Sequence, residues 1–159
     1  MNIALAPNRV LGVVAIAGSA LGLAMMVPIL MQGSIFRAID QLALLSVVLL
    51  YGYGIWSGIG AVKGRSGWRT HARYFWVAQV PSISSSLVTF AVSCGAGAWL
   101  YLRLGSAGVG AGAAAYMGSG YQWSYMQHKP ELLLGVNVLA LAIVVWLSLP
   151  NRSARGNAV

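Results

Sequence analysis

Residues 74–102 read YFWVAQVPSISSSLVTFAVSCGAGAWLYL, a stretch that contains no charged residue. A helix needs about 20 apolar residues to cross a hydrocarbon core of about 30 Å, and this stretch is longer than that. By length and composition it is therefore expected to be a transmembrane helix. Pro81 is expected to kink this helix or to mark its true start, because proline lacks the amide donor that a helix interior requires.

Three other ranges are also long runs without a charged residue. Residues 10–31, 42–62 and 132–149 are also uncharged, and each reaches the length of roughly 18 residues that marks a candidate span. The chain has 159 residues and is only 8% charged, whereas soluble domains contain about 25% charged residues. We therefore predict one all-α domain over residues 1–159, an integral-membrane four-helix bundle with a longer outer loop between its third and fourth helices.

The net charge of +8 is distributed unevenly along this predicted bundle. Basic residues lie at the ends of the apolar ranges rather than along one face, which argues against nucleic-acid binding and follows the positive-inside rule. One side of the membrane would hold Arg9, Lys63, Arg65, Arg69, Arg73, Arg152 and Arg155. Both termini and the 63–73 loop are therefore predicted to be cytoplasmic, in a bacterial inner membrane.

The basic loop is also the candidate contact with lipid. Lys63, Arg65, Arg69 and Arg73 lie next to aromatic residues in KGRSGWRTHARYFW. Cations near a membrane surface attract anionic lipid head groups, at about 1 kcal/mol each. Bound lipid is thus the non-protein component that we expect, and no cofactor is predicted.

Polar side chains recur in the stretch 74–102 at spacings of three and four residues. They are Gln79, Ser82, Ser86, Thr89 and Ser93. On a helix they would share one face, which would turn away from lipid towards other helices or water. Two interpretations stay open, namely hydrogen bonds between helices and a hydrated path for a neutral solute.

Glycines at a four-residue spacing are the second pattern within the apolar ranges. Gly18 and Gly22 form one pair, and Gly54 and Gly58 form another. Helices in lipid associate through close van der Waals contact, which small residues permit. We interpret these glycines as close-packing positions; the alternative is a broken or re-entrant helix that lines a cavity.

Residues 105–130 form the predicted outer loop, which is long for a connector and uncharged over most of its length. Its first part is rich in glycine and alanine, and aromatic residues follow. An interfacial or re-entrant element would fit this composition better than disorder. Tyr116, Tyr121, Trp123 and Tyr125 are the candidate partner surface.

Groups that could support catalysis or metal binding are sparse. Cys94 is the single cysteine, which excludes an intrachain disulfide and predicts a packing role. His71 and His128 fall in loops on opposite sides of the predicted bundle, too far apart to share a metal ion. Asp40 and Glu131 lie at the ends of apolar ranges, so no titratable group is placed at mid-membrane for a proton-coupled pump.

The function predicted from these observations is that of a non-catalytic subunit or accessory factor of a membrane protein assembly. Its partners would be other integral membrane subunits or further copies of the same chain. Two other functions stay open: a passive channel or carrier for a small neutral solute that uses the polar row, and a subunit that handles a lipid, a quinone or a pigment. The sequence favours a protein that is not an enzyme.

Overall fold

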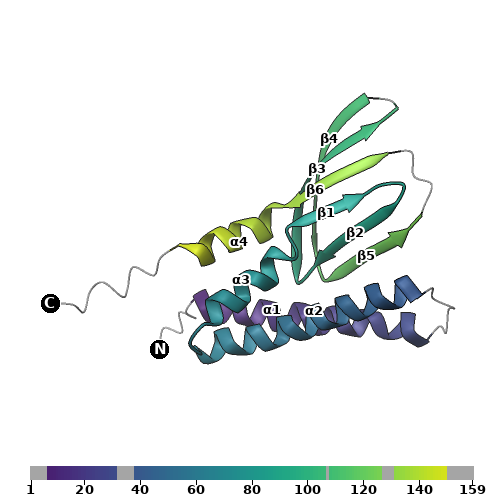
Figure 1. The fold of residues 1–159 in the computed structure, drawn as a ribbon. Helices are drawn as coiled ribbons and strands as arrows, with labels where there is room; N and C mark the ends of the chain where they lie inside the picture. The colour runs from purple at the N-terminus through teal and green to yellow at the C-terminus, as the bar shows by residue number, and fades with distance from the viewer. Residues whose placement is uncertain (1–6, 32–37, 107, 127–130, 150–159) are drawn as a thin grey trace.

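The computed structural model describes residues 7–31, 38–106, 108–126 and 131–149. Within these residues the chain forms four helices and a six-stranded sheet (Figure 1). The helices are α1 (Pro7–Met31), α2 (Ala38–Lys63), α3 (Trp68–Val77) and α4 (Val138–Ser148). The strands are β1 (Pro81–Ser84), β2 (Val88–Ser93), β3 (Ala96–Gly105), β4 (Gly108–Met117), β5 (Gly120–Tyr125) and β6 (Leu132–Asn137).

The prediction of an all-α four-helix bundle is wrong. Residues 74–102 start in α3 and continue through β1 and β2 into β3. Residues 132–149 are a strand, β6, followed by the short helix α4, and the predicted outer loop at 105–130 contains β4 and β5. Among the described residues only α1 and α2 are long and apolar enough to cross a membrane.

A period of two in the side chains explains why the stretch is extended. In AWLYLRLG, Leu100, Leu102 and Leu104 alternate with Trp99, Tyr101 and Arg103. Alternation of this kind places one set on each face of a strand. Pro81 stands at the first position of β1, where a missing amide donor is tolerated. Length and apolarity alone do not distinguish such strands from a membrane helix.

The sheet has the strand order β4-β3-β6-β1-β2-β5, and all neighbouring strands are antiparallel. Strand β6 returns from the end of the chain to lie between β3 and β1, with Trp99 opposite Asn137 and Leu104 opposite Leu132. The amide of Gly118 donates to the carbonyl of Gly95 at 2.9 Å. The β2–β3 and β4–β5 connections therefore lie side by side, which requires the sheet to curl.

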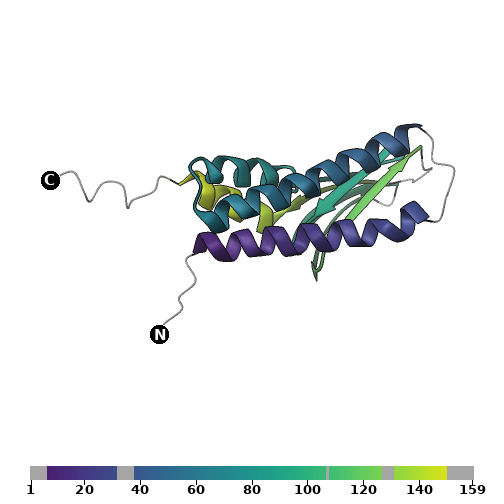
Figure 2. The same ribbon diagram turned by 90° about the horizontal axis from the view of Figure 1, so that it is seen from below.

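The curl produces two wings, β3–β4 and β2–β5, that meet at these connections and separate towards the other end (Figure 1). We call the meeting point the converging end. The α1–α2 hairpin runs beside α3 at one end and beside the converging end and β5 at the other. Figure 2 shows α1 and α2 side by side, with the remaining elements behind them.

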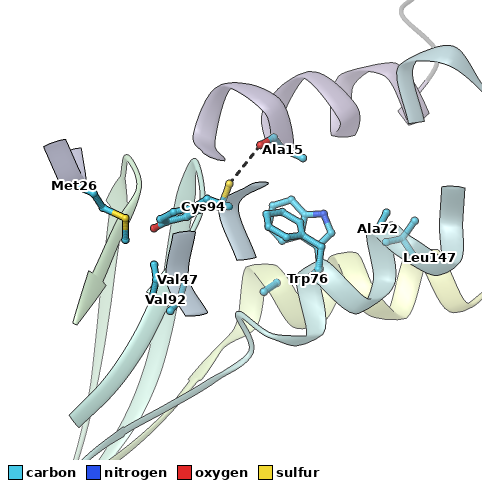
Figure 3. Close-up of a cluster of buried hydrophobic side chains, with 11 residues drawn as sticks. Ala15, Met26, Val47, Ala72, Trp76, Val92, Cys94 and Leu147 are labelled. Atoms are coloured by element: carbon cyan, nitrogen blue, oxygen red, sulfur yellow. Dashed lines mark hydrogen bonds between the residues drawn. The ribbon is translucent and has the colours of Figure 1, made fainter. Parts of the chain in front are cut away.

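The hydrophobic core fills the space between the hairpin and the elements behind it (Figure 3). Met26, Val47 and Val92 lie at the sheet end, and Ala72 of α3 lies beside Leu147 of α4 at the other end. Only the hairpin face that points at α3 and the sheet contributes to this core. The opposite face is therefore left without a protein neighbour in the described part of the chain.

Candidate functional site

A cavity of about 470 Å³ lies on the concave side of the curled sheet. All six strands of the described sheet contribute to its lining. The side chains that matter most for its chemistry are Ser82, Ser84, Thr89, Trp99, Tyr101 and Gln122. No charged residue lines the cavity within the described residues. The site is thus built from hydroxyl groups, an amide and aromatic rings.

Strand register places these side chains together. Ser84 is opposite Thr89, and Ala91 is opposite Gln122, so these residues share one face of the sheet. We call it the inner face, because it lines the cavity. The outer face carries the alternate residues, which include Ile83, Phe90, Val92, Leu100, Leu102, Leu104, Leu134 and Val136. The inner face therefore carries the polar side chains together with Trp99, Tyr101 and Tyr116, and the outer face carries mainly aliphatic side chains and the aromatic rings of Phe90 and β5.

Glycines make room for the aromatic rings on the inner face. A Cβ atom on Gly112 would collide with the ring of Tyr101, and one on Gly97 would lie 3.2 Å from the ring of Tyr116. The Tyr116 hydroxyl donates to Ser93 Oγ. This bond joins β4 to β2 across the inner face and closes the cavity at the converging end.

Some polar groups of the cavity have hydrogen-bond partners within the protein and others do not. The hydroxyl groups of Ser84 and Thr89 lie 2.9 Å apart and hydrogen-bond to each other. Within the described residues, the hydroxyls of Ser82 and Tyr101 and the amide of Gln122 make no side-chain hydrogen bond. Three neutral polar groups are therefore available to a bound molecule.

The predicted polar row does not lie on one helix face. Ser82 and Thr89 line the cavity, and Ser93 is buried at the converging end. Gln79 is buried after the end of α3, where its side-chain amide donates to the Phe75 carbonyl at 3.3 Å. Ser86 is exposed in the β1–β2 turn. These residues therefore do not form the single polar helix face on which the predicted solute path was placed.

The four aromatic residues of the candidate partner surface fall on two faces. Tyr116 is on the inner face, whereas Tyr121, Trp123 and Tyr125 are on the outer face of β5. Tyr121 packs against the buried core. The structure therefore does not bring these four residues into one surface.

The four basic residues of the predicted lipid contact also divide. Lys63 and Arg65 are exposed, and Arg73 lies over the ring of Tyr74, at 5.8 Å. The Arg69 guanidinium donates to the carbonyl oxygens of Trp146 and Leu149, at 3.2 and 3.1 Å. Arg69 thus caps the carboxyl end of α4, where a cation is favourable.

The close-packing glycines contact different elements. A Cβ atom on Gly58 would lie 2.7 Å from the carbonyl oxygen of Gly12, so this position joins α2 to α1. At Gly22 a Cβ would lie 2.5 Å from the Tyr51 ring, and at Gly18 it would lie 2.5 Å from the amide nitrogen of Gly95. Gly18 therefore allows the β2–β3 connection of the sheet, rather than a second helix, to pack closely against α1.

Gly54 faces two elements at once. A Cβ atom there would collide with Ser19 Oγ of α1 and would lie 2.5 Å from the Phe75 ring of α3. Both helices that contain the predicted glycines are continuous through them. In the structure, therefore, none of these four glycines marks a break in a helix.

Tyr51 is the residue that links the hairpin to the sheet, and sequence reasoning did not assign it to this contact. Its side chain is fully buried, and its hydroxyl lies 3.1 Å from the carbonyl oxygens of Ser93 and Gly120. Ser119 adds a second link, because its hydroxyl accepts from the Gly95 amide and donates to the Gly18 carbonyl. These links hold the converging end against the hairpin.

Cys94 lies at the converging end and is fully buried. Its thiol lies 3.4 Å from Ser19 Oγ and 3.6 Å from the Ala15 carbonyl oxygen (Figure 3). Burial raises the pKa of this thiol to about 11, which keeps it protonated at neutral pH. A protonated and enclosed thiol is a poor nucleophile, so Cys94 is a packing residue in this structure.

Trp99 and Tyr101 are site residues that sequence reasoning missed. The period of two in residues 98–105 could have identified them, because it separates these rings from the leucines of the opposite face. Within the described residues no three potential metal ligands come together. No protein-family model or curated protein matches the sequence, and no solved structure matches the fold.

Proposed function

We propose that this protein is a non-catalytic membrane subunit that the α1–α2 hairpin anchors in a bacterial inner membrane and that associates with further chains through its sheet. The observation that carries the proposal is the exposure of the hairpin. In the most apolar window of each helix only 33% of the residues are buried. A core helix of a water-soluble protein would be mostly buried instead.

The dimensions of the hairpin support a membrane position. Helices of 25 and 26 residues are about 38 Å long at 1.5 Å per residue, and a hydrocarbon core is about 30 Å thick. Leu42 and Leu49 on α2 are 64% and 63% exposed. Side chains of this kind lose favourable burial in water but are well solvated by acyl chains.

The charges at the hairpin ends support one orientation. Arg9 lies near the start of α1 and Lys63 ends α2, so both stand at the same end of the antiparallel pair. Arg65 is exposed beside them. The positive-inside rule places this end in the cytoplasm. The carboxyl end of α4 lies near this end too, through Arg69; the C-terminal residues 150–159 lie outside the described part.

The outer edge of β4 supports association with another chain. No strand pairs with this edge in the described residues, and β4 contains neither a charged residue nor proline. Exposed edges of monomeric proteins are usually blocked by such residues. Val109 and Met117, at the two ends of the strand, are 76% and 93% exposed.

A second copy of the chain fits this edge. Antiparallel pairing of β4 with its own copy, centred on Ala113, sets Val109 opposite Met117 and Tyr116 opposite Gly110. Within the sheet Tyr116 already lies opposite a glycine, Gly97. A two-fold contact of this type is isologous and closed, and it satisfies the backbone groups of the edge, which lipid cannot do.

A charged substitution on β4 tests the association. Ala113→Lys is expected to convert a dimer in mild detergent into a monomer, because two lysines would face each other across the two-fold axis at the centre of the contact. Light scattering that corrects for bound detergent measures the mass. Ser86→Lys, in an exposed turn, is the matched control and should stay dimeric. A wild-type protein that is monomeric, purifies without other chains and leaves the membrane fraction on alkaline washing contradicts the proposed function.

A further inference from the structure

We propose that the cavity of the curled sheet is a binding site for the uncharged, hydroxyl-rich ring of a sugar. The inference stands on the cavity itself and does not depend on the membrane position of the hairpin. Its volume of about 470 Å³ falls within the range of about 300–1,000 Å³ that is usual for small-molecule sites. Trp99 and Tyr101, which line the site from the inner face of β3, were assigned to none of the predicted functions.

The absence of charge from the described lining selects a neutral ligand. Arg103 follows Tyr101 on the inner face of β3, towards the end of the sheet opposite the converging end. Its Nε lies 3.9 Å from Oε2 of Glu131, so its charge is paired outside the cavity. An ionic ligand in the cavity would lose its hydration without gaining an opposite charge, which is costly. Anions, cations and zwitterions are therefore poor ligands for this site.

The arrangement of polar and aromatic groups selects a ring that carries hydroxyls. Ser82, Tyr101 and Gln122 contribute groups without a partner in the described residues, and they come from three different strands, β1, β3 and β5. Trp99 and Tyr101 contribute aromatic surface beside them. A sugar ring satisfies both, because its hydroxyls bond the polar groups while its C–H face packs on an aromatic ring. A purely apolar ligand would leave the three polar groups unpaired, at a cost of about 1–3 kcal/mol for each buried one.

Such a ring reaches the cavity either as a free saccharide or as the head group of a glycolipid. Strands β4 and β5 are the edges of the described sheet and are not paired with each other. The cavity is therefore not closed by a complete barrel, and a ligand can enter between the two wings. The free saccharide and the glycolipid head group both present the same neutral sugar ring to the site.

Saturation-transfer NMR on the purified full chain tests the proposal. The protein is kept in a polyoxyethylene detergent, which contains no sugar. The probes are glucose, galactose, N-acetylglucosamine and trehalose for the free saccharide, dodecyl maltoside for the glycolipid head group, and decylubiquinone and inorganic phosphate as chemically different competitors. We expect saturation transfer to the ring protons of at least one sugar probe. A response confined to dodecyl maltoside assigns the glycolipid source.

Two variants show whether the signal comes from the cavity. Tyr101→Ala is expected to weaken sugar binding at least tenfold, and Gln122→Ala is expected to weaken it without removing an aromatic ring. Leu102→Ala, next to Tyr101 but on the outer face, is the matched control and should bind as the wild type does. Circular dichroism confirms that each variant is folded. Failure of all sugar probes to bind, binding of decylubiquinone or phosphate in their place, or equal weakening by Tyr101→Ala and Leu102→Ala overturns the proposal.

Discussion

Gly54→Leu is expected to prevent the hairpin from packing against α3 and to abolish the stable folded protein. Gly54 is buried where α1, α2 and α3 meet, and even a single Cβ atom would collide with Ser19 Oγ and lie 2.5 Å from the Phe75 ring. Extra methylenes in a packed core cost about 1–3 kcal/mol, which is the range expected for Gly54→Ala. The larger side chain of leucine would fit only if α1 or α3 moved away from α2. Thermal unfolding in detergent, followed by near-ultraviolet circular dichroism, measures both variants.

Gly52 provides the matched control on the same helix. A Cβ atom at Gly52 would have no heavy atom within 4 Å of it among its described neighbours. Gly52→Leu should therefore unfold at or above the wild-type temperature, because leucine favours a helix over glycine by about 0.8 kcal/mol. Equal destabilisation by the two leucine substitutions would show that Gly54 does not lie in a three-helix contact.

Tyr51→Ala is expected to have the second largest effect, a loss of about 3–5 kcal/mol from the free energy of unfolding. The ring of Tyr51 fills the space beside Gly22, and its hydroxyl lies within hydrogen-bond distance of the Ser93 and Gly120 carbonyls. Removing it leaves a cavity and also frees the converging end from α2. Stabilities of folded domains are only about 5–15 kcal/mol, so this loss removes a large share of the total.

Tyr51→Phe separates the two contributions of this side chain. Phenylalanine keeps the ring and removes only the hydroxyl, so a loss of about 1 kcal/mol is expected. Denaturant unfolding with tryptophan fluorescence measures both variants, and Leu49→Ala on the exposed face of α2 is the control that should change little. A phenylalanine variant as unstable as the alanine variant would contradict a packing role for the ring.

The sequence predicts the hairpin better than the rest of the fold. Ranges 10–31 and 42–62 are uncharged and long, and the corresponding segments of the structure are helices. The glycines at 12, 22 and 58 lie where α1 meets α2 or its side chains, because small residues allow helices to approach. Composition agreed with the structure in these two ranges, where the glycine spacing also fits a contact between two helices.

The sheet could not be recognised from composition, because its strands are as apolar as a membrane helix. The spacing of Ser82, Ser86, Thr89 and Ser93 matches a helical face, although Ser82 and Ser84 flanking Ile83 already show the alternation of a strand. The place of β6 between β3 and β1 is a long-range pairing that no local pattern contains. The cavity depends on that pairing and on the curl, so local alternation could point to Trp99 and Tyr101 but could not bring them together with Ser82 and Gln122.

Spin-label accessibility in vesicles tests whether the exposed face of the hairpin lies in lipid, as proposed. Nitroxides are placed at Leu49→Cys, on the exposed face of α2, and at Arg65→Cys, in the exposed basic loop, both in a Cys94→Ala background. For a hairpin in lipid, oxygen is expected to relax the label at position 49 strongly while a water-soluble nickel chelate does not, and the label at position 65 is expected to show the reverse. If the nickel chelate reaches the label at position 49 as readily as the label at position 65, the exposed face of the hairpin lies in water and the membrane position is wrong.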